Sequence, residues 1–241
     1  NMNEVIVLIN YAHRGASEFY PENTLYAFYM GLEMKANGIE TDIQRTKDGV
    51  LVLFHDDDLK RILGIEKSIK DYTYDELLKL DFGIFKGPQF ANEKIVTLKE
   101  FLTHFGSKDL QLALEIKQPG IEADLLNMIH QCCVKENVII TSFHWDSIVK
   151  ARSLDPDITL GYLTSFVDND LLDKLVQNGI QQICPQASHF TEELNQAARS
   201  RKLSVRFWGV TNDALMRKAI DMGVDGMTIN NPQALADELG W

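Results

Sequence analysis

The 241-residue sequence has no long hydrophobic run, no set of cysteines suited to several disulfides and no excess of positive charge. The apolar run at residues 5–9 is too short for a membrane-spanning helix or the core of a signal peptide. With only Cys132, Cys133 and Cys184, we expect reduced thiols in a cytoplasmic protein. The net charge of −11 repels nucleic-acid backbones and anionic lipid, so we expect no nucleic-acid partner and no stable membrane insertion.

What is present is the composition of a globular protein, with 45% hydrophobic and 24% charged residues and no internal sequence repeat. Eight strand-like runs rich in Val, Ile and Leu alternate with eight helical patterns. The strands are expected at 5–11, 38–44, 110–117, 138–143, 159–163, 180–184, 204–210 and 225–229, and the helices at 24–35, 98–105, 122–134, 146–154, 170–177, 192–202, 213–222 and 232–239. This alternation predicts an α/β fold, a closed (β/α)8 TIM barrel that forms a single domain over residues 1–241.

One segment interrupts the alternation. Residues 51–54 form a ninth strand candidate, joined to the second strand by a short turn containing Asp48-Gly49. So short a connection requires antiparallel pairing, and a turn centred on this dipeptide places Asp42 opposite His55. The polar stretch 56–97 that follows is long for a barrel loop, which predicts a small insertion between strand two and helix two, over one mouth of the barrel.

Ionisable residues collect where the predicted strands end, which is where barrel active sites lie. Glu40 and Asp42 are two residues apart on one strand and face the same side, and Glu115 lies near the end of the next barrel strand. Three carboxylates in one barrel mouth repel each other unless a cation neutralises them. An all-oxygen ligand set favours one divalent cation, Mg²⁺ or Ca²⁺.

Two histidines and two cations flank the predicted metal site. His13 and Arg14 follow the first strand, His55 follows the hairpin strand, and Lys117 lies two residues beyond Glu115. Hydrolysis of a phosphodiester needs positive charge on the phosphate oxygens, a proton acceptor and a proton donor. The metal ion, together with the Arg14 and Lys117 side chains, supplies the positive charge. The two imidazoles supply the proton acceptor and the proton donor.

The residues that carry this chemistry also resemble a known family, the glycerophosphodiester phosphodiesterases. The resemblance rests on His-Arg-Gly at 13–15, Pro-Glu-Asn-Thr at 21–24, Glu-Thr-Asp at 40–42, Thr-Lys-Asp-Gly at 46–49, His-Asp at 55–56 and Glu-Ile-Lys at 115–117. Later blocks are Ser-Phe at 142–143, Trp-Gly-Val at 208–210 and Gly-Val-Asp-Gly at 223–226. The first 56 residues match most specifically, and the segment 183–186 matches only loosely.

The resemblance implies a metal-dependent barrel enzyme, a phosphoric diester hydrolase. It would release sn-glycerol 3-phosphate and an alcohol from glycerophosphodiesters such as glycerophosphocholine or glycerophosphoethanolamine, in glycerol and phospholipid metabolism. It implies a catalytic acid–base pair of two histidines, three metal ligands and four substrate contacts. The acid–base pair would be His13 and His55, and the metal ligands would be Glu40, Asp42 and Glu115. The substrate contacts would be Arg14, Lys117, Trp208 and Phe143, with Trp208 forming an apolar wall beside the glycerol.

Several alternatives remain open at this level. The same barrel could act as a phospholipase C- or D-like enzyme on phosphatidylinositol or lysophospholipid, or bind metal and phosphate without catalysis. The nucleophile is either water or the 2-hydroxyl of the glycerol. The sequence does not distinguish the acid histidine from the base, the alcohol that is released, or the oligomeric state.

Overall fold

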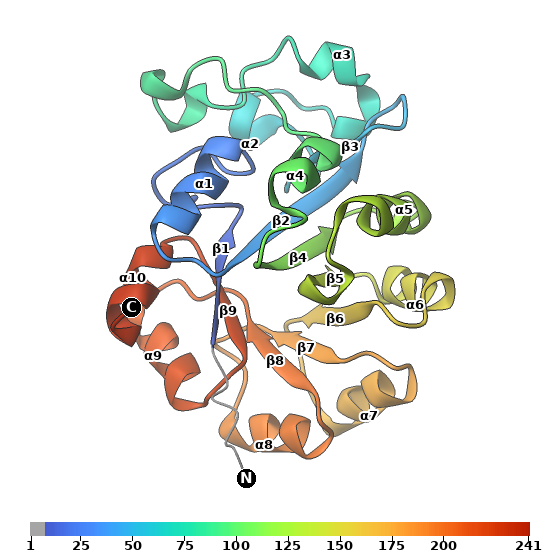
Figure 1. Ribbon diagram of the computed structural model, residues 1–241, viewed down its shortest axis with the longest axis vertical. Coiled ribbons are helices and arrows are strands. Elements are labelled where there is room, and N and C mark those ends of the chain that lie inside the picture. Colours follow the sequence, from blue (N-terminus) through green and yellow to red (C-terminus); the bar gives the residue numbers. More distant parts are fainter. Residues whose placement is uncertain (1–7) are drawn as a thin grey trace.

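A computed structural model describes residues 8–241, and a closed barrel of eight parallel strands lies at its centre (Figure 1). The barrel strands are β1 (Ile9–His13), β2 (Gly38–Arg45), β4 (Gln111–Ile116), β5 (Val138–Ser142), β6 (Thr159–Thr164), β7 (Gln182–Pro185), β8 (Ser204–Phe207) and β9 (Gly226–Ile229). β1 pairs in parallel with both β2 and β9, which closes the sheet. The predicted (β/α)8 barrel is confirmed, although residues 5–7 of its predicted first strand lie outside the described residues.

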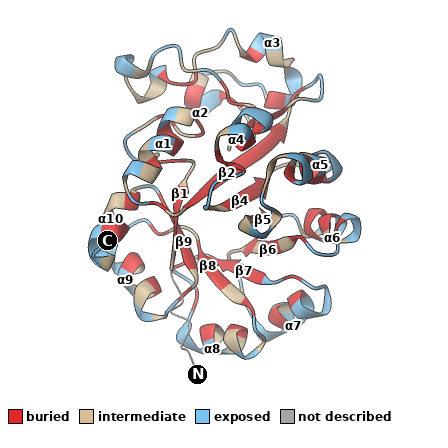
Figure 2. Cartoon of the chain, viewed as in Figure 1, coloured by how far each residue is buried: buried red, intermediate tan, exposed pale blue. Residues whose placement is uncertain are grey.

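Helices surround the barrel. They are α1 (Leu25–Glu33), α4 (Leu98–Phe105), α5 (Glu122–Cys132), α6 (Trp145–Leu154), α7 (Asn169–Gln177), α8 (Glu192–Ser200), α9 (Asp213–Asp221) and α10 (Pro232–Leu239). All of them except α5 and α6 have an N-cap side chain that accepts a hydrogen bond from the first turn. Thr24, for example, accepts a hydrogen bond from the backbone N–H of Ala27. The strands are buried almost throughout, whereas the helices are buried on the inner face and exposed on the outer one (Figure 2). The carboxyl ends of all eight barrel strands therefore meet at one mouth.

The short strand β3 (Leu51–Leu53) forms the predicted antiparallel hairpin with β2, but the predicted register is wrong by one residue. Ile43 lies opposite Leu53, and the N–H of Phe54 donates to the carbonyl of Asp42. Phe54 and not His55 is therefore opposite Asp42. The reason is a three-residue loop, closed by a hydrogen bond from Thr46 N–H to the Val50 carbonyl, in which Gly49 takes the left-handed conformation that such loops require.

Between β3 and α4 the chain forms only short helices. These are α2 (Lys60–Leu63), η1 (Ile69–Asp71), α3 (Tyr74–Leu77), η2 (Ile84–Lys86) and η3 (Pro88–Phe90). They lie beyond β3 and beside α1, away from the ring of later helices (Figure 1). Phe54, Ile62, Leu77 and Phe82 are among the buried residues of an apolar cluster separate from the main core. This segment therefore packs through its own small core against the hairpin arm.

Two further observations bear on the composition of the chain. The three cysteines are all unpaired in the structure. Within residues 8–241, no helix is both long enough and apolar enough to span a bilayer.

Candidate active site

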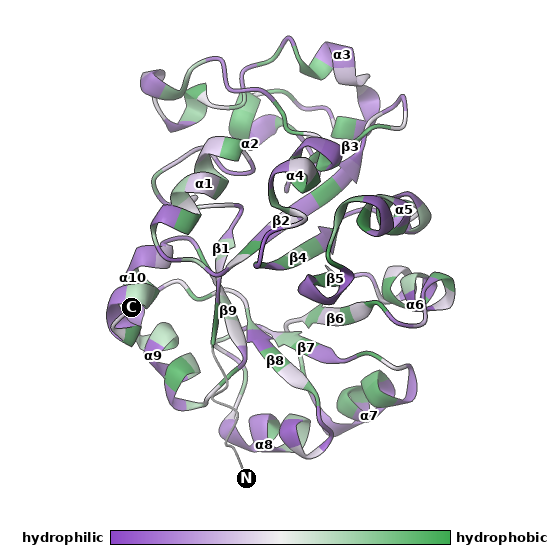
Figure 3. Cartoon of the chain, in the orientation of Figure 1, coloured by the Kyte–Doolittle hydropathy of each residue, from purple (hydrophilic) through white to green (hydrophobic). Residues whose placement is uncertain are grey.

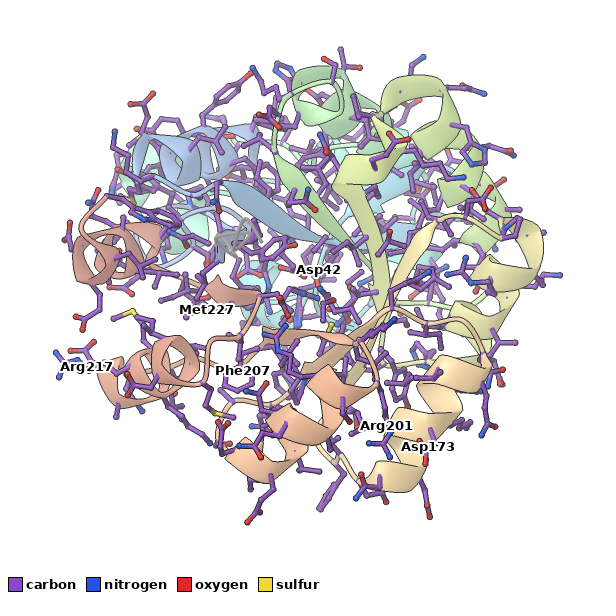
Figure 4. The ribbon with its side chains drawn as sticks, turned by 60° about the horizontal axis from the view of Figure 1, so that its bottom comes forward. Asp42, Asp173, Arg201, Phe207, Arg217 and Met227 are labelled. Atoms are coloured by element: carbon purple, nitrogen blue, oxygen red, sulfur yellow. The ribbon has the colours of Figure 1, made fainter. Side chains whose placement is uncertain are left out.

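Three carboxylates meet inside the barrel, near the carboxyl ends of two neighbouring strands. Asp42 on β2 is the sheet neighbour of Glu115 on β4, and Glu40 lies two residues before Asp42 on the same face. One oxygen of each side chain lies within 4.8 Å of the other two, and all three residues are buried. Asp42 lies toward the centre of the barrel in Figure 4.

The electrostatics of this group favour a bound cation. Burial and the neighbouring carboxylates raise the pKa of Glu40 well above its usual range, and burial and Asp42 raise the pKa of Glu115. Burial also acts to raise the pKa of Asp42, but Arg14 and His55 outweigh it and lower that pKa. Glu40 Oε2 and Asp42 Oδ1 are buried without a hydrogen-bond partner. Because unpartnered buried oxygens are costly, these three residues fit a hard divalent cation, which takes such oxygens as ligands.

Two positively charged side chains, those of Arg14 and Lys117, border the carboxylates. Arg14 Nε lies 3.3 Å from Asp42 Oδ2, and Lys117 Nζ lies 3.0 Å from Glu115 Oε1 and 4.0 Å from Asp42 Oδ1. Arg14 and Gly15 form a tight turn with φ of 58° and 87°. A Cβ at Gly15 would lie 2.4 Å from the backbone of Ala27, so only glycine lets this turn pack on α1 and aim Arg14 at the site.

His13 is the last residue of β1, and a neutral amide holds it. Its Nδ1 lies 2.6 Å from Asn230 Oδ1, and its Nε2 lies 3.8 Å from Glu40 Oε2. An amide oxygen can only accept, so Nδ1 carries the proton and Nε2 presents a lone pair toward the carboxylates. Burial and the charge of Arg14 lower the pKa of His13 from 6.5 to about 3. This imidazole is therefore neutral near pH 7, which leaves the lone pair of Nε2 unprotonated.

His55 follows β3, and a carboxylate holds it. Its Nδ1 lies 2.6 Å from Asp56 Oδ1, which leaves Nε2 as its free ring nitrogen. His13 and His55 come from different strands but line the same cavity, together with Arg14, Glu40 and Glu115. The structure therefore places both predicted histidines beside the predicted metal ligands.

The cavity has a volume of about 350 Å³, and its lining also includes the apolar side chains of Phe143, Leu163 and Trp208. The Phe143 and Trp208 rings meet edge to face, with centroids 5.3 Å apart. Trp208 Nε1 donates to the carbonyls of Thr164 and Cys184, so two neighbouring strands fix the orientation of its ring. The two aromatic residues suggested by the family resemblance thus line the same cavity as the charged groups.

Three residues around the site were missed or left open by the sequence analysis. Asn230, 217 positions after His13, orients that imidazole. Asn23 does not cap α1, which is the role of Thr24; its amide donates to Asp42 Oδ2 at 3.1 Å and accepts from Thr41. In physical terms, contacts between residues far apart in sequence leave no local pattern by which they could be found.

Arg206 is the third of these residues, and here a signal was available. It lies on β8, which is hydrophilic over part of its length (Figure 3), and it is 1% exposed. Its guanidinium donates to Thr228 Oγ1 at 2.6 Å and to Gln182 Oε1 at 3.3 Å, and it lines the same cavity. A charged residue between Val205 and Phe207 in a buried strand is uncommon enough to mark a functional or structural site.

The remaining histidines lie outside this group of residues. His104 on α4 contacts the Tyr29 hydroxyl, and His130 on α5 contacts Asp155. His144 precedes α6 but its side chain does not cap the helix; its Nε2 lies 3.3 Å from the Lys117 carbonyl oxygen. His189 stacks on the exposed ring of Phe166.

Comparison with known proteins agrees with this geometry. Residues 13–234 match the glycerophosphoryl diester phosphodiesterase family. The chain is 35% identical over 229 residues to a glycerophosphodiester phosphodiesterase of Caldanaerobacter subterraneus subsp. tengcongensis, covering 93% of this chain and 94% of that protein. It is 32% identical over 247 residues to one of Bacillus subtilis, covering 93% and 84%.

A solved structure extends the similarity to the whole fold. A phosphodiesterase of Oleispira antarctica, determined in complex with the product sn-glycerol-3-phosphate, superposes with a TM-score of 0.89. The two chains are 26% identical, over 98% of this chain and 97% of that one. The chain therefore belongs to the glycerophosphoryl diester phosphodiesterase family, a family of hydrolases.

Proposed function

We propose that this chain hydrolyses glycerophosphodiesters, such as glycerophosphocholine and glycerophosphoethanolamine, to sn-glycerol 3-phosphate and an alcohol. The observation that carries the proposal is the single cavity in which buried carboxylates face two imidazoles and an arginine. The Oleispira relative bound to sn-glycerol-3-phosphate supports the same product here. Phosphodiester cleavage needs charge neutralisation and proton transfer, and this cavity offers residues for both.

Glu40, Asp42 and Glu115 hold one divalent cation, Mg²⁺ or Ca²⁺, in this proposal. When bound, the ion supplies positive charge to the phosphate oxygens and offsets the repulsion among its three ligands. Arg14 and Lys117 bind the phosphate from the side, because both lie within 4.0 Å of the carboxylate cluster. Two buried carboxylate oxygens without hydrogen-bond partners support this assignment.

The histidines divide the proton transfers between them. His13 takes the proton of the nucleophile at Nε2, since its Nδ1 proton is engaged by Asn230. His55 delivers a proton to the oxygen of the departing alcohol, and Asp56 holds its ring for that step. The nucleophile is either water or the 2-hydroxyl of the glycerol; the second route gives a cyclic phosphate that water then opens.

Trp208 and Phe143 bind the carbon skeleton of the glycerol in this scheme, because their rings contact each other and line the cavity that holds the charged groups. We further propose a single barrel domain over residues 1–241, with residues 56–97 as an insertion that carries part of the site's support. The unpaired thiols favour a reducing compartment. We therefore propose a cytoplasmic enzyme of glycerol and phospholipid metabolism.

The experiment that tests this function measures release of sn-glycerol 3-phosphate from glycerophosphocholine with a coupled dehydrogenase. Parallel samples contain Mg²⁺, Ca²⁺ or excess chelator, and circular dichroism verifies the fold of each. We expect turnover with a divalent ion and its loss in chelator. Absence of turnover with either ion contradicts the proposal; hydrolysis of a lysophospholipid under those conditions would instead support the phospholipase alternative.

A further inference from the structure

Arg61 stands at the centre of a hydrogen-bonded network that joins α2 to the barrel. Its guanidinium donates to Asp56 from Nε at 2.6 Å and from Nη2 at 3.0 Å. It also donates to Glu22 from Nη1 at 2.8 Å and from Nη2 at 2.7 Å. One planar side chain thus binds two carboxylates with two hydrogen bonds each, an arrangement that only arginine provides.

Each of these carboxylates in turn holds a residue of the site. Asp56 Oδ1 accepts from His55 Nδ1 at 2.6 Å, and Glu22 Oε1 accepts from Arg14 Nη1 at 2.9 Å. The side chains of Glu22 and Asp56 are only 15% and 21% exposed, so water cannot readily replace these contacts. Within residues 8–241, Arg61 forms hydrogen bonds only with Asp56 and Glu22, and it does not line the cavity.

The charges of this network depend on Arg61. Burial acts to raise the pKa of Glu22 and of Asp56, but the hydrogen bonds from Arg61 hold both pKa values below their usual range. Without the guanidinium, two partly buried carboxylates would be left close together, and each would have one fewer cationic partner. Both side chains, and the residues that they hold, would then lose their fixed geometry.

We propose that Arg61 is a positioning residue that fixes His55 through Asp56 and Arg14 through Glu22. The segment after β3 thereby sets a proton-transfer group and a phosphate contact at the same time. This inference rests on the proposed function for the roles of His55 and Arg14, whereas the placement of their side chains does not depend on it. Displacing a reacting group by about 1 Å costs on the order of 100-fold in rate, so the effect on catalysis is expected to be large.

The neighbouring residue provides a matched control. Lys60 lies on the same helix and forms one ion pair, with Glu66 at 2.6 Å, in which both side chains are mostly exposed. Lys60→Met therefore removes a cation from α2 without touching Asp56 or Glu22. Arg61→Met removes the neighbouring cation that does touch them, which is 46% exposed against 64% for Lys60, and Arg61→Lys keeps the charge but not the planar fork.

The first test is steady-state kinetics on glycerophosphocholine with saturating metal. We expect Arg61→Met to lower kcat by about 10- to 100-fold and to raise KM a few-fold, with Arg61→Lys intermediate and Lys60→Met within 2-fold of the parent. In a protein that already carries E22Q and D56N, Arg61→Met should lower kcat by less than a further 3-fold, because the two carboxylates through which Arg61 acts are already absent. The proposal would be overturned if a folded Arg61→Met protein had unchanged kcat. It would also be overturned if Arg61→Met lowered kcat by the same factor in the E22Q/D56N background as in the parent.

The second test does not require turnover. Nitrogen-15 NMR of labelled imidazoles, assigned with His55→Ala and His13→Ala, reports which ring nitrogen carries the proton. We expect His55 Nδ1 to keep its proton in the parent and in Lys60→Met, and the proton to be shared between Nδ1 and Nε2 in Arg61→Met while His13 is unchanged. An unaltered His55 signal would overturn the proposal, even if glycerophosphocholine proved not to be a substrate.

Discussion

The residues that line the cavity differ in the chemistry of the contacts that hold their side chains. We call His13, Arg14, Glu40, His55, Glu115 and Arg206 the charged half, and Phe143, Leu163 and Trp208 the aromatic half. In the charged half, Asn230 holds His13, Asp56 holds His55 and Lys117 contacts Glu115. In the aromatic half, Phe143 is 41% exposed, and its edge-to-face contact with Trp208 is its one aromatic contact among residues 8–241.

This difference indicates a division of labour within one site. Charged groups must be placed accurately, because proton transfer and charge neutralisation depend steeply on distance. Apolar contacts depend mainly on buried area and tolerate small displacements. We therefore expect changes in the charged half to reduce kcat or metal affinity, and changes in the aromatic half to alter KM.

The largest effect is expected from the histidines. His13→Ala and His55→Ala each remove a proton-transfer group and should lower kcat by about 10²- to 10⁴-fold. Metal affinity, measured by isothermal titration calorimetry, should remain within a few-fold of the parent, because neither imidazole is among the proposed ligands. A variant with kcat near the parent value would show that its histidine has no part in proton transfer.

Next in size is the loss of a carboxylate. Glu40→Gln or Asp42→Asn should weaken metal affinity by more than the roughly 10- to 100-fold seen when a residue behind a ligand is removed. Calorimetric titration with Mg²⁺ and Ca²⁺ measures this directly. Parent-like affinity in Glu40→Gln would remove that residue from the ligand set.

Glu40→Gln should also change how the stability of the metal-free protein depends on pH. The pKa of Glu40 is raised in the folded protein, so its protonated form stabilises the fold below about pH 4.5, its ordinary value, and this contribution is lost as pH rises through the raised value. Melting temperatures of the metal-free parent should therefore fall between pH 5 and pH 8 by more than those of Glu40→Gln. Parallel melting curves for the two proteins would contradict this expectation.

Smaller effects are expected in the aromatic half. Trp208→Leu should raise KM for glycerophosphocholine by about 10-fold and leave kcat within a few-fold, since it removes apolar contact area and no charge. Phe143→Leu, at a more exposed position, should raise KM only about 2- to 3-fold. A fall in kcat without a change in KM would place Trp208 with the charged half instead.

Much of the fold and of the charged half could be predicted from the sequence. Apolar runs alternating with amphipathic patterns predict the barrel, and strand-end positions predict the meeting of Glu40, Asp42 and Glu115. The register of β3 could not be fixed in this way, because the two- and three-residue loops around Asp48-Gly49 differ only in backbone conformation. Asn230 and Arg61 could not be found either, because each acts through a side-chain contact that no local spacing encodes.

The most direct test of this division of labour is a parallel measurement of kcat and KM for His55→Ala and Trp208→Leu on glycerophosphocholine, with saturating metal. The account predicts that His55→Ala loses kcat by at least about 100-fold with little change in KM, and that Trp208→Leu does the reverse. If both variants lost kcat to the same extent, the two halves of the cavity would not have separate roles, and the account would be wrong.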